Sequence, residues 1–301
     1  MCLINRGYCI FREFGSHTIR RSGWWERLRL HAMRGVLLAG LLLLWGGAAW
    51  AAGPEFDHDH TRWNQLLSRH VWMLEEGRQS QVDYAGLLEE HDSLRLYLEE
   101  LAAVDRPRFD GWSEQQRLAF LINAYNAWTV ELILGEYPDL DSIRDLGSLF
   151  RSPWSRRIVN LFGESLSLDY VEHRLIRGAQ GFGEPRIHFA VNCASIGCPA
   201  LRPEAFVGER LEEQLENATR LFLADPSRNR LQGDTLWVSE LFDWYAEDFR
   251  QGWRGIRSVS QFLARYRDAM QLPAGVSRDL AQDRVRIRYL DYDWRLNDLT
   301  P

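Results

Sequence analysis

The sequence predicts an α+β protein: a predominantly helical single domain with a small, mostly antiparallel sheet. Apolar residues recur at helical spacing in several long stretches, of which residues 114–135 are the most apolar. Between these stretches, four short runs near residues 157, 187, 235 and 287 have the pattern of strands. No linker or repeat divides the chain after residue 51, so one globular domain is expected over residues 52–301.

The first 51 residues have the features of a targeting segment. Met33 begins a short positively charged stretch, followed by an apolar run at residues 36–45 and by small residues that end at Ala51. These are the three parts of a secretory signal. The run is shorter than the roughly 20 residues that span a bilayer, which favours a cleaved signal peptide at residues 33–51 over a retained membrane segment. Residues 1–32 are expected to lie upstream of the true start, and the protein to be exported to the periplasm or the extracellular space.

Charge and composition exclude several classes of function. Cleavage would remove seven arginines and two glutamates, which changes the net charge from −6 to about −11. Because such a surface repels phosphate backbones, nucleic acid is not an expected partner. The chain has no lysine, which excludes Schiff-base chemistry and a Walker-type phosphate loop. The partner that remains expected is a small-molecule or peptide ligand of unknown identity.

The N-terminal part of the expected domain is helical in pattern. One helical face is formed by Trp63, Leu66, Leu67, His70, Val71 and Leu74, and a second amphipathic helix is expected over residues 82–104. His58 and His60, flanked by acidic residues, are two apart, which is not the spacing of helical metal ligands. We therefore expect a solvated helix start there, with no metal and no cofactor.

Ser113 and Gln116 form a capping box that starts the central helix. This helix is apolar almost all round, yet it carries Asn123 and Asn126 three positions apart and so on one face. A buried amide without a partner costs about 1–3 kcal/mol. Bonds to backbone carbonyls of a neighbouring loop are favoured over a direct role in chemistry, and both asparagines are candidates for positioning that loop.

The remaining elements alternate between short strands and helices. We expect a strand at 157–161, helices at 168–177 and 208–223, a hairpin at 230–238, helices starting near 239 and 258, and a strand at 285–290.

The stretch 186–202 is the strongest candidate for a site. It places His188 within an apolar run that reads as a buried strand and follows it with Asn192, Cys193, Ser195 and Cys198. Cys193 and Cys198 would be the only cysteines of the exported chain, and their separation allows a disulfide.

Several motifs resemble those of the domain-of-unknown-function family 547, which occurs in bacterial exported proteins and in plant proteins with a leucine-zipper region. They lie at residues 118–134, 167–177, 187–206 and 289–297, and the family core would cover about 82–240. Plant members keep the His-Phe-Ala start of the third motif but vary at the cysteines. The resemblance therefore favours His188 over a cysteine as the functional residue. The resemblance implies a fold-level grouping and no established activity.

A helix followed by a His-bearing strand and an Asp-bearing strand also fits the plan of papain and transglutaminase-like enzymes. Their nucleophile position would fall near Asn123.

Three classes of function are compatible with these residues. The sequence slightly favours a binding or scaffold protein of the cell envelope. The first alternative is a hydrolase or acyl transferase with His188 as general acid or base, oriented by Asp291, Asp293 or an asparagine, and with Cys193 or Ser195 as nucleophile. The second is a thiol-disulfide redox protein that uses Cys193 and Cys198.

Overall fold

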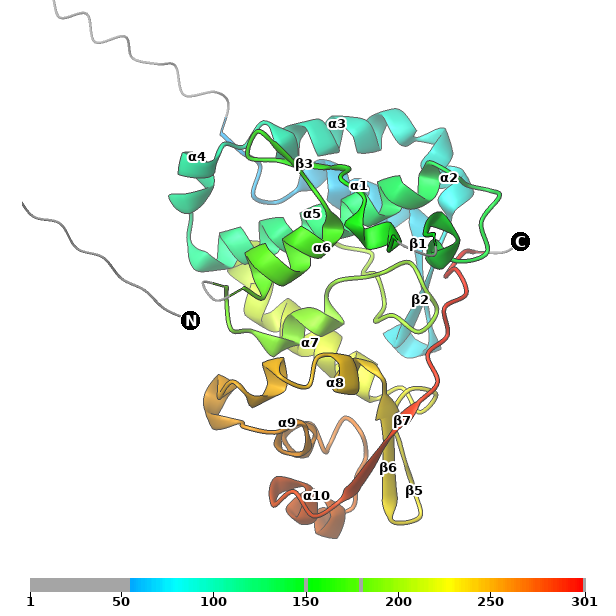
Figure 1. The fold of residues 1–301 in the computed structure, drawn as a ribbon, viewed down its shortest axis with the longest axis vertical. Helices are drawn as coiled ribbons and strands as arrows, with labels where there is room; N and C mark the ends of the chain where they lie inside the picture. Colours follow the sequence, from blue (N-terminus) through cyan, green and yellow to red (C-terminus); the bar gives the residue numbers. More distant parts are fainter. Residues whose placement is uncertain (1–54, 149–150, 179–180, 300–301) are drawn as a thin grey trace, which may run out of the picture. The chain divides into compact units, whose positions relative to one another are not determined.

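The computed structural model describes residues 55–148, 151–178 and 181–299, and all of these belong to one compact unit, residues 53–301 (Figure 1). The signal peptide and start site expected within residues 1–51 lie outside the described residues. No helix in the described ranges is long and apolar enough to cross a membrane.

The N-terminal third combines four helices with one hairpin. Its elements are α1 (Thr61–His70), β1 (Val71–Leu74), β2 (Gln79–Val82), α2 (Tyr84–Glu89), α3 (His91–Ala102) and α4 (Arg106–Asp110). The first helix was predicted to continue to Leu74, but it ends at His70, and the chain turns back through residues Glu75 to Gly77, which all have positive φ. The second predicted helix begins later than expected, because Val82 pairs with Val71, and it is divided at Glu90.

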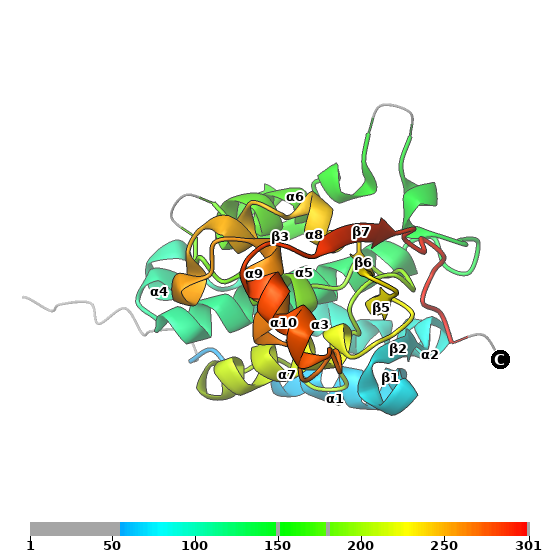
Figure 2. The ribbon, with the colours of Figure 1, turned by 90° about the horizontal axis from the view of Figure 1, so that it is seen from below.

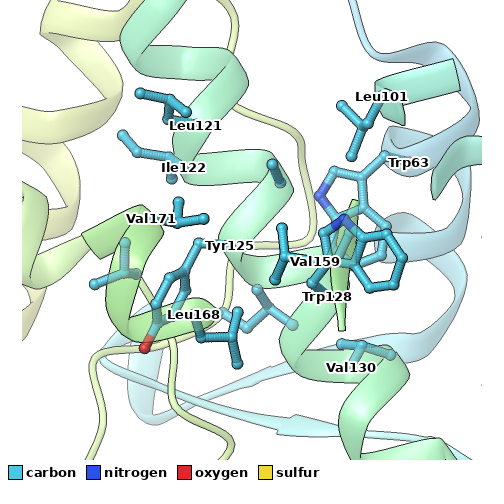
Figure 3. Close-up of a cluster of buried hydrophobic side chains, with 14 of the residues drawn as sticks. Trp63, Leu101, Leu121, Ile122, Tyr125, Trp128, Val130, Val159, Leu168 and Val171 are labelled. Carbon is cyan, nitrogen blue, oxygen red and sulfur yellow. The ribbon is translucent and has the colours of Figure 1, made fainter. Parts of the chain in front are cut away.

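The helix α5 (Glu114–Leu134) is the centre of the fold. Ser113 accepts a hydrogen bond from the Gln116 amide, and the Gln116 side chain accepts one from the Ser113 amide, as the capping box predicted. Figure 3 shows residues of α5, among them Tyr125 and Trp128, packed with side chains from α1, α3, β3 and the segment around Leu168. Because α5 is covered on nearly every side, its polar residues must be bonded within the protein.

The chain then leaves α5 for a set of short elements. They are 3₁₀ turns at Ile143–Leu146 and Pro153–Ser155, a hairpin of β3 (Val159–Leu161) and β4 (Glu164–Leu166), and α6 (Leu168–Tyr170), which continues as a π-helical turn at Val171–Ile176. The strand predicted near residue 157 therefore pairs only within its own hairpin.

The C-terminal half surrounds a second core cluster that contains Phe189, Phe242, Phe249 and Phe262. Its main elements are α7 (Leu211–Leu223), β5 (Arg230–Gln232), β6 (Thr235–Ser239), α8 (Leu241–Trp244), α9 (Val259–Arg265), α10 (Ala274–Ala281) and β7 (Arg286–Leu290), with 3₁₀ turns at Gly208–Arg210, Asp248–Arg250 and Trp253–Gly255. The strands lie in the order β5-β6-β7, and after β7 the chain returns toward β2 (Figures 1 and 2).

The predicted α+β class is confirmed, but the predicted single sheet is wrong. In the described ranges the strands form three small sheets, and three of the four strand pairings are antiparallel, while β6 and β7 run parallel. The run near residue 187 is a 3₁₀ turn at Pro185–Phe189 and not a strand. Pro185 has no N–H group to donate to a strand ladder. The Glu184 side chain accepts a hydrogen bond from the Arg186 backbone amide and so caps the turn.

A buried histidine near the N-terminus predicts acid sensitivity. His60 is 2 % exposed, and Nδ1 accepts a hydrogen bond from the Tyr97 hydroxyl at 2.7 Å. Burial lowers the pKa of His60 to about 3. Between pH 6.5 and 3 the unfolded chain binds a proton here that the folded protein excludes, so stability falls as the pH falls, by on the order of 4 kcal/mol.

The substitution His60→Asn tests this expectation. Asparagine suits the left-handed backbone at this position (φ 50°) and can accept the Tyr97 bond, but it does not titrate. Urea denaturation at pH 8 and pH 4 should show that the variant loses less stability on acidification than the wild type does. Equal losses in the two proteins would contradict a neutral buried His60.

Candidate functional site

The central helix holds the candidate segment by two side-chain amides. Asn126 Nδ2 donates to the Ala190 carbonyl at 3.0 Å, and its Oδ1 accepts from the Asn192 amide at 2.8 Å. One turn earlier, Asn123 makes the same two-way contact with the backbone of Phe206. Both asparagines therefore bond loop backbone, and together they fix the two ends of the segment that contains the cysteines.

The segment itself is closed into a small loop. Cys193 and Cys198 form a disulfide with their Cα atoms 6.1 Å apart. Asn192 lies at the start of this loop, where Nδ2 donates to the Pro199 carbonyl and Oδ1 accepts from the Ala194 amide, both at 2.8 Å. Such a loop has little conformational freedom, and it presents a fixed surface to its neighbours.

The C-terminal segment docks directly on this loop. The Gly197 amide donates to the Asp293 carbonyl at 2.8 Å. A Cβ atom at Gly197 would lie 2.9 Å from the ring of Tyr292, so a glycine is needed for this close approach. Docking brings Tyr292 and Trp294 beside a segment that is about a hundred residues away in the chain.

His188 is held by a carboxylate from a distant segment. Its Nε2 lies 2.7 Å from Asp248 Oδ2, and its ring stacks on Tyr245 with the ring centroids 3.9 Å apart. Arg177 binds the same carboxylate, with Nε at 2.5 Å and Nη2 at 3.2 Å. The guanidinium also lies over the Tyr245 ring, 4.6 Å from its centroid, so Tyr245 contacts both His188 and Arg177.

These contacts determine the charge state of the pair. Burial lowers the pKa of His188, and this effect outweighs the opposite effect of the Asp248 hydrogen bond. Burial alone would raise the pKa of Asp248, but hydrogen bonds from His188 and Arg177 lower it to about 2. At neutral pH the pair is therefore a carboxylate and a neutral imidazole, in which Nε2 carries the proton and donates it to Asp248.

The second ring nitrogen is then a free base. Nδ1 of His188 is buried and has no hydrogen-bond partner among the described residues. His188 lines a cavity of about 170 Å³. Part of its wall is aromatic, and the wall includes the disulfide: the lining residues are Tyr125, Trp154, Asp169, Glu172, His173, His188, Val191, Cys193, Cys198, Pro199, Leu241, Trp244, Tyr245, Tyr292 and Trp294.

The acidic side of the cavity contains a second buried carboxylate. Glu172 is 5 % exposed, and its Oε1 has no hydrogen-bond partner among the described residues. The cation nearest to this oxygen is Arg177, whose Nη1 lies 3.9 Å away. Asp169 also lines the cavity, and its pKa is raised by burial. Arg177 is thus shared between two carboxylates, those of Asp248 and Glu172.

The structure corrects the predicted surroundings of His188. Asp291 and Asp293 do not bind it: Asp293 pairs with Arg295, and both aspartates line a different cavity. In the disulfide, Cys193 has no thiolate to act as a nucleophile. The Ser195 hydroxyl is 3.3 Å from the Tyr292 hydroxyl and 3.2 Å from Cys193 Sγ. The Ser195 hydroxyl thus faces the disulfide and Tyr292.

Sequence reasoning missed Asp248, Tyr245 and Glu172. The signal for the first two was weak but present, because Tyr245 and Asp248 are three apart in a stretch predicted as helical and therefore share a face. Nothing local marks Asp248 as the partner of a histidine 60 positions earlier. Within the described ranges, no group of three or more His, Cys, Asp and Glu residues is arranged to hold a metal ion.

Comparison with known families finds a match for the segment that contains His188. Residues 109–223 match the family described as "Protein of unknown function, DUF547". Neither the comparison with curated proteins nor the comparison with solved structures finds a match. The match supports the family predicted from the motifs, and the matched segment contains α5, His188 and the disulfide.

Proposed function

We propose that this chain is an enzyme that hydrolyses a small ester or amide, and that His188 is its general base. The observation that carries the proposal is the free Nδ1 of a buried, neutral histidine whose other nitrogen is bonded to Asp248 beside a cavity. A histidine that served only packing would have both nitrogens bonded and no cavity next to it. The scaffold alternative explains the buried histidine but not its free nitrogen.

The reaction would use water directly. With Cys193 in a disulfide, no thiolate competes for the substrate, so a covalent thioester intermediate is not part of the proposal. Nδ1 takes a proton from a water molecule as its oxygen attacks the carbonyl carbon, and it returns that proton to the leaving group as the carbonyl-to-leaving-group bond breaks. Asp248 stabilises the imidazolium that exists between these two transfers.

A panel of small chromogenic esters and anilides tests the proposal on the purified full-length protein. A substrate of the wild type should be turned over 10²–10⁴-fold more slowly by His188→Gln, because general-base catalysis contributes about that factor. His173→Gln is the matched control, since His173 lines the same cavity but is half-exposed and does not contact Asp248 in the described structure. Hydrolysis that is equally fast in the His188 variant, or absent in the wild type across the panel, would overturn the proposal.

We also propose that the protein acts after export. The signal-like segment at residues 33–51 and the pair of cysteines in one small loop support this location, because disulfides persist in oxidising compartments.

Intact-mass measurement of protein from the cell envelope tests the export proposal. The mass should correspond to a chain that starts near Ala52, and alkylation without reductant should add no label to Cys193 or Cys198. A mass that includes residues 1–32, or two labelled thiols, would contradict the proposal.

A further inference from the structure

The cavity beside His188 combines aromatic walls with excess negative charge. Glu172 and Asp169 line it, and Asp248 is bonded to His188 in its wall. The Arg177 guanidinium contacts Glu172 and Asp248. With His188 neutral, Glu172 and Asp248 share one guanidinium, that of Arg177. His173 bonds Arg177 through Nδ1, lies 4.0 Å from Asp169 and Glu172, and is half-exposed.

Glu172 carries the strongest signal for a missing cation. A buried carboxylate oxygen without a hydrogen bond is costly, since burying an unpaired polar atom costs about 1–3 kcal/mol and a charged one more. The nearest cationic nitrogen, Arg177 Nη1, is too distant at 3.9 Å for a hydrogen bond to this oxygen. Two of the guanidinium's N–H groups are already used by Asp248. A positive group within the cavity would supply the partner that Glu172 lacks.

The aromatic part of the cavity wall is suited to the same kind of group. Trp244, Tyr292 and Trp294 pack with centroid separations of 4.6–5.6 Å, and Trp154 contacts Trp294 from a different segment. Aromatic faces attract cations within about 6 Å of the ring centroid. The Arg144 guanidinium already lies 5.2 Å from the centroid of Trp294, so this cluster accepts a cation where one is available.

The size of the cavity limits the ligand. A cavity of roughly 150 Å³ holds a molecule of the size of benzene, and this one measures about 170 Å³. Trp244 is 43 % exposed, so the aromatic wall can be reached from solvent.

We infer that the cavity binds the head of a small organic cation, a substituted ammonium or guanidinium group, between Glu172 and the aromatic cluster of Trp244, Tyr292 and Trp294. This inference rests on the proposed function, because the cation would be the part of the substrate that places its carbonyl beside His188. Charge selects the ligand here, since a neutral group of the same shape leaves Oε1 of Glu172 without a cation at hydrogen-bond distance.

Choline and its neutral carbon isostere 3,3-dimethylbutan-1-ol form a direct test. Binding to the full-length protein is measured by calorimetry at 150 mM NaCl, with tryptophan fluorescence as a second readout. We expect choline to bind at least 10-fold more tightly than the isostere, and Glu172→Gln to reduce this preference at least 10-fold. Glu213→Gln removes the same charge from an exposed position on α7 and should leave the preference unchanged.

Two further variants separate the possible failures. Trp244→Leu removes one aromatic wall without touching the buried carboxylate, so it should weaken choline binding even if Glu172→Gln does not fold. His188→Gln should retain choline binding and lose hydrolysis. The cation inference is overturned if choline and the isostere bind equally, or if neither binds while a neutral monosaccharide does. The hydrolysis rate of His188→Gln tests the proposed function independently of these binding results.

Discussion

Replacing Asp248 with asparagine is expected to lower the rate of any reaction at this site by about 10²–10⁴-fold. The carboxylate accepts a hydrogen bond from Nε2 of His188, which leaves Nδ1 with a free lone pair. An asparagine amide in the same place can donate to Nε2 instead. The ring would then carry its proton on Nδ1, and the base would be lost although the histidine is still present.

The pH dependence of the rate provides a second readout for this pair. The base works only when neutral, so the rate should rise as the pH increases through the pKa of His188 and then stay constant. Burial places that pKa below the ordinary value of 6.5, and the plateau should therefore begin at a lower pH than for a solvent-exposed histidine. Asp248, with its pKa of about 2, stays ionised throughout this range.

Asp243→Asn is the matched control, because Asp243 is an exposed carboxylate on α8 close to Asp248 in the chain. It should keep both the rate and the pH profile of the wild type. An Asp248→Asn protein with full activity and an unchanged profile would show that the carboxylate does not set the tautomer of His188.

Replacing Arg186 with methionine is expected to destabilise the fold by about 3–5 kcal/mol, the usual cost of breaking a buried ion pair from one side. The side chain is completely buried beside the candidate site. It donates to both carboxylate oxygens of Glu184, at 2.8 and 2.7 Å, and to both oxygens of Glu212, at 2.9 and 2.7 Å. Its guanidinium also lies 4.9 Å from the centroid of Trp253. Methionine fills much of the space but leaves Glu184 without its cation.

Urea denaturation measures the stability lost in Arg186→Met, and we expect this loss to become smaller at acidic pH. Hydrogen bonds from Arg186, and secondarily from Arg254, lower the pKa of Glu212 to about 2. A carboxyl whose pKa is lowered in the folded protein contributes stability above its unfolded pKa, near 4.5, and loses it as the pH falls toward 2. The difference in the free energy of unfolding between the wild type and Arg186→Met should therefore decrease as the pH falls over this range.

Arg220→Met serves as the control for a lost charge, since Arg220 pairs with Glu216 but is half-exposed. Exposed pairs contribute about 0–1 kcal/mol, so this variant should be nearly as stable as the wild type. Similar losses of stability in Arg186→Met and Arg220→Met would mean that burial does not increase the contribution of the Arg186 ion pairs to stability.

The sequence by itself determined the elements whose causes are local. The capping box starts α5, the apolar surface of α5 makes it central, and the Gly-Asp turn joins β5 to β6. The disulfide between Cys193 and Cys198 was also predictable, because the two cysteines are only five positions apart. The positions of Asn123 and Asn126 on one helical face likewise indicated that they would bond a neighbouring loop.

Only the tertiary structure decided which groups meet at His188. The segment around it was predicted as a strand because its residues are apolar, yet a 3₁₀ turn buries them equally well, and burial does not distinguish the two. Asp248 reaches His188 across 60 positions, and Glu172 reaches the cavity from a π-helical turn. Residue pattern encodes which side chains are buried, whereas the partner of a buried polar group depends on how distant elements pack, and that packing is a property of the whole core.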